Sequence, residues 1–369
     1  MTISHRIKSI FSHAMESTDA IIIKNASAPF IDATFFYVTG IKQGLFEGCI
    51  AVLFPSGSLQ LLVSNLERPL VPSSIKVETY TSKQDFSEKL RYILNESHTI
   101  GVNTSSLLHD EYIALQEILS DTHFVSVSQA IKTARIIKDA EEIDRIRKAC
   151  HIADQVMEQI PTFFSAPLTE HQLASEIDHL LKQYGASSPA FETISSFGPN
   201  TAKPHYASGN REIQAGDFII CDFGATIDHY HSDMTRTFVY GTASNQQKKM
   251  HQTVLKAQNK ALQMIKPGVL ASTVHQVTKE TIDATEFKGY FIHSTGHGLG
   301  LEVHDPGIGF ADSYETGLQP GMVLTVEPGI YIPEIGGVRI EDDIVVTPDG
   351  YIQLTTSSKD LIEIPISLQ

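Results

Sequence analysis

The sequence predicts a protein of two domains, a small α/β domain followed by a larger α+β domain. Its 369 residues exceed the length of one ordinary domain. The first third of the chain alternates helical and strand-like stretches, whereas the remainder mixes long amphipathic helices with antiparallel strands and shows no regular β–α–β alternation. We therefore place the two domains at residues 1–130 and 131–369.

Composition restricts the class of protein. Hydrophobic residues make up 41% of the chain, and no apolar run approaches the roughly 18 residues that a membrane span needs. The amino-terminal stretch MTISHRIKSIFSHAME predicts an amphipathic helix and not a signal peptide, because it lacks a continuous apolar segment. The formal charge is −15, and the sequence shows no cluster of basic residues that would bind the phosphates of a nucleic acid. We expect a cytoplasmic protein that binds neither nucleic acid nor membrane.

The first domain is predicted from short runs of β-forming residues with turn residues between them. We expect strands within residues 19–26, 48–64, 98–103 and 122–128, and a helix over residues 82–94. No cluster of metal-ligating or nucleophilic residue types lies in this part of the sequence, so no chemistry is assigned to it.

The second domain opens with helices that have clear start signals. Apolar residues recur at helical spacing after Asp139, and Thr169 and Gln172 have the spacing of a capping box. We expect helices within residues 137–160, 168–185, 244–265 and 272–284. We expect strands at residues 218–224, 230–240, 322–327 and 338–347.

Four acidic residues lie inside or at the end of apolar strands. A hairpin symmetric about residues 227 and 228 would set Asp222 directly across from Asp233, and a symmetric loop would bring Glu327 opposite Glu341. A carboxylate in such a strand is nearly always paired or metal-bound when it is buried. Like charges directly opposite each other destabilise a sheet. The sequence therefore predicts either a different register or a cation between the carboxylates.

The stretch HSTGHGLGLEVHD, residues 293–305, combines histidines with glycines. His293 and His297 have the four-residue spacing of two metal ligands on a helix, but the glycines between and after them disfavour a helix. A phosphate-binding loop would need a following helix, whereas LEVHD is strand-like. We therefore expect one histidine of this stretch to bind metal together with the four carboxylates.

Four carboxylates and one neutral imidazole carry a formal charge of −4, which matches two divalent cations. Two such ions about 3.5–4 Å apart can hold a water molecule and lower its pKa toward neutrality. Ligands rich in oxygen favour Mn²⁺, and the imidazole also permits Co²⁺ or Zn²⁺. The residues thus predict a hydrolytic centre with two divalent metal ions.

These motifs resemble those of the proline-specific metallopeptidases of the pita-bread fold, the M24-type Xaa-Pro aminopeptidases and Xaa-Pro dipeptidases (prolidases). HSTGHGLGLEVHD is similar to that group's histidine signature, and CDFGATIDHYHSDMTRTF to its paired-aspartate segment. TVEPGIY and GGVRIEDDIVVT resemble its two glutamate segments, and NTAKPHYASGN resembles the segment with a substrate-facing histidine. The motifs span residues 137–355, while the amino-terminal domain matches more loosely, mainly through FFYVTG.

The resemblance implies a ligand set and two bridging residues. The implied ligands of two divalent ions are Asp222, Asp233, His297, Glu327 and Glu341. Asp233 and Glu341 would bridge the ions, and Glu327 would also carry a proton from the water to the leaving nitrogen. The resemblance further implies a pita-bread catalytic domain preceded by a smaller α/β domain, and a homodimer or higher homo-oligomer.

Other residues are expected on the substrate side. His205 and His304 would face the substrate and polarise the scissile carbonyl. Arg339 would orient the Glu341 carboxylate or help to bind the substrate. His293 would line the pocket for the proline ring and bind no metal.

The expected activity is hydrolysis of the Xaa-Pro bond at the amino terminus of peptides, that of an Xaa-Pro aminopeptidase. Prolidases often have an arginine after the H-D segment that meets the free carboxylate of a dipeptide, and residues 305–321 contain no arginine or lysine. An Xaa-Pro dipeptidase is the alternative, and a non-catalytic pita-bread binding protein is less favoured because no ligand is missing. Methionine aminopeptidases share the ligand pattern but generally lack the extra amino-terminal domain.

Overall fold

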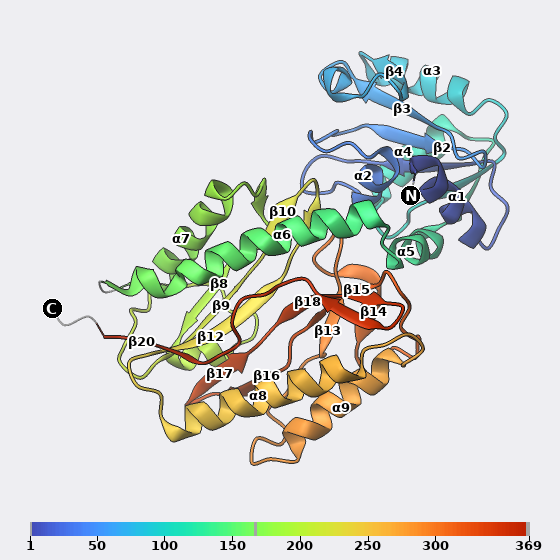
Figure 1. Ribbon diagram of the computed structural model, residues 1–369. Coiled ribbons are helices and arrows are strands. Elements are labelled where there is room, and N and C mark those ends of the chain that lie inside the picture. The colour runs from blue at the N-terminus through green and yellow to red at the C-terminus, as the bar shows by residue number, and fades with distance from the viewer. Residues whose placement is uncertain (1, 166–167, 367–369) are drawn as a thin grey trace. The chain divides into compact units, whose positions relative to one another are not determined.

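The computed structural model describes residues 2–165 and 168–366, and the chain forms two compact units (Figure 1). The units are Met1–Arg135 and Ile136–Gln369, so the division falls near the end of helix α5 (Ser128–Ile136). Both units mix helices with strands, as the sequence predicts. Within the described ranges, no helix is long and apolar enough to cross a membrane.

The first unit is built on one six-stranded mixed sheet. Its strands are β1 (Ala20–Lys24), β2 (Ile50–Leu53), β3 (Leu59–Ser64), β4 (Lys76–Tyr80), β5 (Thr99–Val102) and β6 (His123–Ser126). They lie in the order β4-β3-β2-β1-β5-β6. The other helices of this unit are α1 (Ile3–His13), α2 (Ala33–Thr39), α3 (Lys83–Ile93) and α4 (His109–Ile118). Leucines of α3 and α4 pack on the sheet around Ile22 and Val52.

The strands and the α3 helix expected from the sequence are confirmed in this unit, but β4, α4 and α5 were missed, and so was α2. Its sequence, ATFFYVT, is rich in aromatic and β-branched residues that favour strands. The helix forms because Asp32 caps its first turn, with a carboxylate oxygen accepting from the backbone N–H of Thr34 over 2.8 Å. Phe35 and Val38 are fully buried, so tertiary packing outweighs the local preference.

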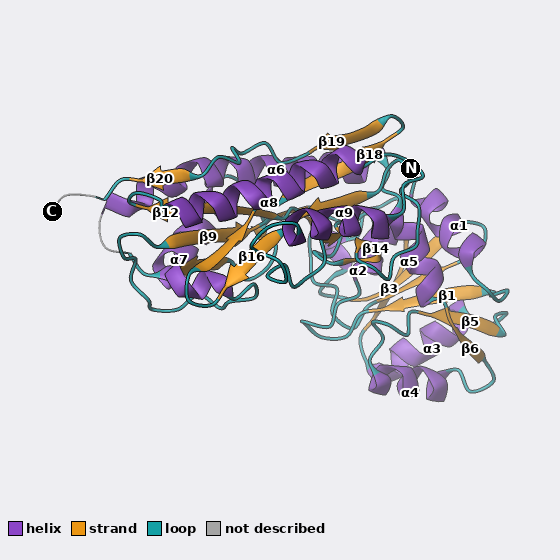
Figure 2. Ribbon diagram, turned by 90° about the horizontal axis from the view of Figure 1, so that it is seen from below, coloured by secondary structure: helices purple, strands orange, loops and turns teal. Residues whose placement is uncertain are grey.

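The four long helices of the second unit begin where the sequence predicts. They are α6 (Ala140–Gln159), α7 (Glu170–Gln183), α8 (Asn245–Met264) and α9 (Ala271–Asp283). Helices α6, α7 and α8 start with complete capping boxes, in which the N-cap residues are Asp139, Thr169 and Ser244. Helices α8 and α9 lie side by side in both views (Figures 1 and 2).

The strands of the second unit form several small sheets. They are β7 (Ser188–Pro189), β8 (Ile194–Phe197), β9 (Phe218–Phe223), β10 (Ala225–Ile227), β11 (Tyr230–His231), β12 (Met234–Tyr240), β13 (Gly296–Gly298), β14 (Asp305–Phe310), β15 (Val323–Val326), β16 (Gly329–Ile332), β17 (Gly336–Arg339), β18 (Asp342–Thr347), β19 (Gly350–Gln353) and β20 (Ile362–Ile364). Two sheets matter most for the site, and their strand orders are β20-β12-β9-β8 and β14-β13-β15-β18-β19.

Two apolar cores hold these sheets in place. Helices α6 and α7 pack on β8, β9 and β12 through residues such as Val156, Ile177 and Phe223. Helices α8 and α9 pack on β14, β15 and β18 through residues such as Leu262 and Leu324. A further cluster packs Phe218 of β9 and Val239 of β12 against α8. Both sheets are thus held by helices, and polar side chains on strands of both sheets can converge in a common cavity.

Candidate metal centre

One cavity in the second unit is lined by all the metal-binding and substrate-binding residues predicted from the sequence. The cavity has a volume of about 560 Å³. The predicted residues that line it are His205, Asp222, Asp233, His293, His297, His304, Glu327, Arg339 and Glu341. The remaining walls are mostly apolar and consist of Phe191, Ile194, Pro204, Ser294, Val303 and Tyr314. An apolar cavity with a few converging polar groups is the usual form of a ligand site.

The two aspartates belong to the hairpin that runs from β9 to β12. Asp222 lies opposite Thr235, so the sequence-based register that placed it opposite Asp233 is wrong by two residues. The difference arises at the turn, where Asp228 and His229 have left-handed backbone angles (φ 48° and 69°) and move the centre of the hairpin. Residues two apart on a strand share a face, so Asp222 and Asp233 still line the same cavity as diagonal neighbours.

The two glutamates come from a second hairpin, in the other sheet. The neighbouring pair Val326–Asp342 places Glu327 and Glu341 opposite each other, which confirms the symmetric loop expected from the sequence. The hydroxyl of Thr235 donates to Oε2 of Glu341 over 2.5 Å, and this bond connects the second hairpin to the first. Glu341 is 2% exposed and Asp233 is 5% exposed.

His297 lies on a short strand, β13, and not on a helix, as its flanking glycines indicate. A Cβ atom at Gly296 would come within 2.0 Å of the carbonyl oxygen of Thr325, so only glycine permits the backbones to approach this closely. The hydroxyl of Thr325 accepts a hydrogen bond from the His297 N–H over 3.0 Å. The stretch after β13 differs from expectation, since residues 301–304 are bends and the strand begins only at Asp305.

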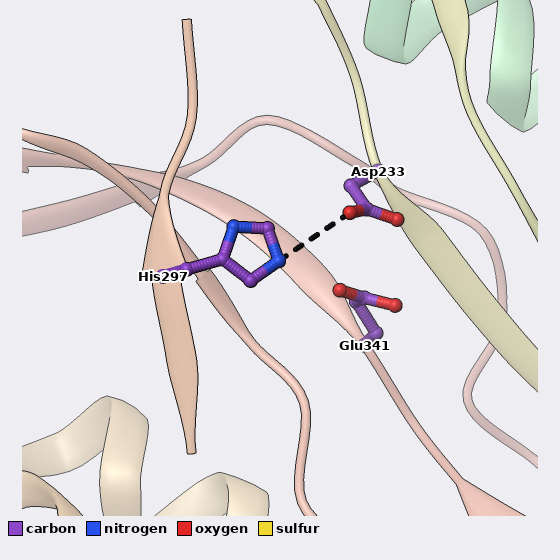
Figure 3. Close-up of side chains that lie close together, drawn as sticks. All are labelled: Asp233, His297 and Glu341. Atoms are coloured by element: carbon purple, nitrogen blue, oxygen red, sulfur yellow. Dashed lines mark ion pairs between the residues drawn. The ribbon is translucent and has the colours of Figure 1, made fainter. Parts of the chain in front are cut away.

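The orientation of the His297 ring exposes a lone pair to carboxylates. Its Nδ1 donates to the carbonyl oxygen of Gly298 over 3.1 Å, which leaves Nε2 as the unprotonated nitrogen. Nε2 lies 3.6 Å from Oδ2 of Asp233 and 3.4 Å from Oε1 of Glu327. Figure 3 shows the ring directed between the carboxylates of Asp233 and Glu341, which directly precede β12 and β18. The lone pair of Nε2 and those of the carboxylate oxygens repel one another. A cation between them would be attracted to all of these atoms.

The electrostatics of the cluster also favour a cation. Three potential ligand atoms lie within 4.8 Å of one another, one from each of Asp233, His297 and Glu341. Burial, reinforced by neighbouring carboxylates, raises the pKa of Asp233 and Glu341 well above the usual range, and burial raises the pKa of Glu327. Oδ1 of Asp222 is buried and has no hydrogen-bond partner. The donor set of carboxylate oxygens and one imidazole nitrogen therefore fits divalent metal ions.

Arg339 holds one of these carboxylates through direct hydrogen bonds. Its Nη2 donates to Oδ2 of Asp222 over 2.5 Å, and its Nε donates to the hydroxyl of Thr235 over 2.9 Å. It reaches Glu341 through Thr235, because that hydroxyl donates onward to the glutamate. Its Nη1 donates to the hydroxyl of Tyr331 over 2.9 Å. Sequence reasoning assigned no role to Thr235 or Tyr331, since a neutral polar residue in an apolar strand carries no signal of its own.

His293 is fixed in the cavity wall and is not directed at the carboxylate cluster. Its Nδ1 donates to the carbonyl oxygen of Ser294 over 2.7 Å, so its Nε2 accepts from the hydroxyl of Tyr331 over 2.8 Å. Its ring meets Phe291 edge-on, with 5.1 Å between ring centroids. Burial is the main reason that the pKa of His293 is lowered. A neutral imidazole with both nitrogens occupied can serve as an apolar wall.

The other two histidines lie at the open side of the cavity. The ring of His304 meets the ring of His297 edge-on at a centroid distance of 4.1 Å. Partial burial, together with the neighbouring His297, lowers the pKa of His304. His205 is exposed and lies on the segment that follows a short 3₁₀ helix, Gly198–Ala202. Both imidazoles can therefore reach a ligand that enters the cavity.

Comparisons with known proteins find matches to both units of the chain. Residues 144–348 match metallopeptidase family M24, and residues 12–137 match the creatinase/prolidase N-terminal domain. An Xaa-Pro dipeptidase of Pyrococcus horikoshii is 37% identical over 94% of this chain and 95% of its own length. An Xaa-Pro dipeptidase of Pyrococcus furiosus is 37% identical over 82% of this chain and 86% of its own length.

Solved structures extend the likeness to the whole fold. The crystal structure of the prolidase from Pyrococcus horikoshii has a TM-score of 0.88 and 34% identity, over 97% of this chain and all of that chain. An X-Pro aminopeptidase from Thermotoga maritima has the same TM-score and 28% identity, over 94% of this chain and 98% of that chain. The larger unit has the pita-bread fold, and the family implies bound divalent metal ions. The chain belongs to metallopeptidase family M24 and carries the N-terminal domain of creatinases and prolidases.

Proposed function

We propose that this chain is an Xaa-Pro dipeptidase, which hydrolyses the bond before proline in dipeptides. The two relatives from Pyrococcus species carry that name and align with most of the chain. Their similarity supports a dipeptidase better than the aminopeptidase expected first from the sequence. The observation that carries the proposal is the single cavity, where the carboxylates, His297 and the other histidines meet inside the segment that matches family M24.

The proposed ligands of two divalent ions are Asp222, Asp233, His297, Glu327 and Glu341. Asp233 and Glu341 are the proposed bridging residues, a role that the resemblance to the family implies, and their carboxylates form one cluster with His297. We favour Mn²⁺ for this oxygen-rich set, with Co²⁺ and Zn²⁺ as alternatives. When bound, such ions supply a Lewis acid and lower the pKa of a water molecule.

The remaining residues bind the substrate and move protons. Glu327 takes up a proton and returns it to the leaving nitrogen of proline, a role that suits a carboxyl whose pKa is raised by burial. His205 and His304 hydrogen-bond to the scissile carbonyl oxygen as it gains negative charge. The Xaa-Pro amide has no N–H, so a site of this kind recognises the proline ring by its shape. His293, held against Phe291, forms part of the wall for that ring.

An Xaa-Pro aminopeptidase is the second candidate, and the composition of the cavity favours it. Among the described residues that line the cavity, Arg339 is the only arginine or lysine, and its nitrogens already donate hydrogen bonds within the protein. A second cavity of about 480 Å³ shares His293 and Ser294 with the first. It would provide room for residues that follow proline in a longer peptide.

A comparison of Xaa-Pro with Xaa-Pro-Yaa hydrolysis decides between the two activities. Purified protein is loaded with defined Mn²⁺, Co²⁺ or Zn²⁺, and the release of free amino acid is measured. We expect a higher kcat/KM for the dipeptide, and the reverse order would support the aminopeptidase. Met-Xaa peptides serve as the control and should not be cleaved. A protein that binds no metal at neutral pH and cleaves no Xaa-Pro peptide would exclude both candidates.

Assembly and location remain predictions. We propose a homodimer or higher homo-oligomer, and a location in the cytoplasm. Sedimentation velocity of the purified protein measures the first, and a single species with the mass of one chain would contradict it. Fractionation of the source cells tests the second.

A further inference from the structure

Glu170 is a fully buried carboxylate outside the metal cluster. It is the first residue of α7 and is 0% exposed. The carboxylates of the metal cluster face one another, whereas this one faces only hydrogen-bond donors. Its position at the start of a helix also suits a negative charge.

The donors to Glu170 come from both sides of His205. Oε1 accepts from the backbone N–H of Phe197 over 2.8 Å and from the side-chain amide of Asn200 over 2.9 Å. Oε2 accepts from the hydroxyl of Tyr206 over 2.8 Å and from the backbone N–H of Gly209 over 3.2 Å. One carboxylate therefore ties down both ends of residues 198–210, which we call the His205 loop.

One further contact closes this network. The amide of Asn200 also donates to the hydroxyl of Tyr206 over 2.9 Å, so Asn200 and Tyr206 form a closed triangle with Glu170. Burial and the hydrogen bond to Glu170 raise the pKa of Tyr206 to about 12, so its hydroxyl remains a donor. A Cβ at position 209 would lie 2.7 Å from that hydroxyl, which explains the glycine there.

The His205 loop is also held at Ser208, whose hydroxyl accepts from the backbone N–H of Ser195 over 2.8 Å and donates to the carbonyl oxygen of Thr193 over 3.2 Å. At its other end, the hydroxyl of Thr201 accepts from the backbone N–H of Gly337 over 2.7 Å, but none of these contacts involves the His205 side chain.

His205 is exposed, and in the described part of the chain its imidazole makes no hydrogen bond. Beyond the 3₁₀ turn, the loop contains no helix or strand. The direction of the imidazole thus depends on the backbone of Pro204 and Tyr206, and the latter is anchored by Glu170.

We propose that Glu170 is a positioning residue that holds the His205 loop, and through it the His205 imidazole, against the cavity. The proposal rests on the proposed function for its kinetic part, because His205 is there the group that meets the scissile carbonyl. Glu170 itself lines neither the cavity nor the carboxylate cluster.

The test is a double-mutant cycle between Glu170→Gln and His205→Ala. The glutamine is nearly isosteric, but its amide group would face donors at one end of the loop. For Xaa-Pro substrates we expect Glu170→Gln to lower kcat by about tenfold in the wild-type background and by less than about twofold in the His205→Ala background. Equal losses in both backgrounds would overturn the proposal, because a merely structural role is additive.

Asp178→Asn is the matched control. Asp178 lies two turns further along α7 and accepts from the hydroxyl of Thr193 over 2.6 Å. Its link to the His205 loop is indirect, because the carbonyl oxygen of Thr193 accepts from the hydroxyl of Ser208 over 3.2 Å. We expect this variant to keep the wild-type kcat. Metal content per chain should be unchanged in all variants. Tyr206→Phe removes a single donor, and it provides a milder second variant if Glu170→Gln does not fold.

Hydrogen exchange supplies a readout that does not depend on activity. Peptides covering residues 198–210 should exchange faster in Glu170→Gln and in Tyr206→Phe than in the wild type, and should be unchanged in Asp178→Asn. If exchange in this loop is the same in all four proteins, the positioning role is wrong even if every protein is active. If the loop loosens but the wild type cleaves no Xaa-Pro peptide, the proposed function fails and the structural part of the inference stands.

Discussion

Arg339 and Asp222 form a short, buried ion pair, with 2.5 Å between Nη2 and Oδ2. The other oxygen of this carboxylate, Oδ1, is buried and has no hydrogen-bond partner. The guanidinium therefore fixes the plane of the carboxylate and leaves one oxygen for a ligand. This arrangement is typical of a partner that orients a metal-binding carboxylate from behind.

Replacement of Arg339 by lysine should weaken metal binding. Lysine keeps the charge but cannot donate to Asp222, Thr235 and Tyr331 at once. We expect affinity for Mn²⁺ to fall by about 10- to 100-fold, as is usual when such a partner is lost, and activity to return at higher metal concentration. Isothermal titration of the metal-free protein measures the affinity. An unchanged affinity combined with a raised KM would instead place Arg339 on the substrate.

Asp233→Asn should abolish activity at every metal concentration. The change removes a proposed bridging carboxylate, whose Oδ2 lies 3.6 Å from Nε2 of His297. Metal content by mass spectrometry and Xaa-Pro hydrolysis across a Mn²⁺ titration test this. Asp228→Asn, in the turn of the same hairpin, is the control and should remain active. Recovery of the Asp233 variant at high metal would argue against a bridge.

His304→Ala should lower kcat strongly while the chain keeps its metal ions. His304 lines the cavity and is not among the proposed ligands. Removal of one preorganised hydrogen-bond donor to a developing oxyanion typically lowers kcat by about 10²- to 10³-fold. Its ring packs on His297, so metal content must be measured beside kcat. Loss of a metal ion in this variant would reverse the roles assigned to the two histidines.

The stability of the metal-free protein should fall as pH rises. Burial, with repulsion among neighbours, raises the pKa of Asp233, Glu327 and Glu341 above the ordinary values of 3.8 and 4.5. A carboxyl with a raised pKa binds its proton more tightly in the folded state. Its contribution to stability is complete below the ordinary pKa and is lost as pH rises through the raised pKa.

Denaturant unfolding of chelator-treated and metal-loaded protein measures this effect. We expect the difference in the free energy of unfolding between the two forms to widen between about pH 5 and 8, where deprotonation leaves the carboxylates to repel one another unless a cation is bound. The metal-free Glu341→Gln variant should show a shallower pH dependence, because one titrating group is gone. A difference that does not change with pH would contradict the assignment of a cation site.

The sequence predicted the glutamate hairpin correctly and the aspartate hairpin incorrectly, for a local reason. The hairpin that joins Glu327 to Glu341 keeps one register along its length. The two residues are therefore equally far from the centre of its loop, and their pairing can be derived from sequence positions alone. The aspartate hairpin turns at Asp228 and His229, and both have positive φ. Such turns are recognised in sequences mainly by asparagine and glycine, so this one gave no signal and the register was displaced.

The partners that hold the ligands could not be predicted. Thr235 donates to Glu341 across 106 positions of sequence, and Tyr331 links Arg339 of its own hairpin to His293, which is 38 positions away. Glu170 was placed only in the first turn of a helix. Motif similarity singled out nine residues that line the cavity, because each of them belongs to a recognisable segment. The supporting hydrogen bonds depend on how distant segments pack, which spacing alone does not encode.

The two carboxylate-bearing hairpins belong to different sheets, and direct bonds such as Glu341 N–H to Thr235 C=O already join them. An ion held by Asp233 and Glu341 would therefore connect one sheet to the other. Binding of the metal would then also stabilise the contact between the two sheets. A cell short of that ion would hold a looser protein that proteases degrade sooner. The supply of metal would then set how long the protein lasts as well as how fast it works.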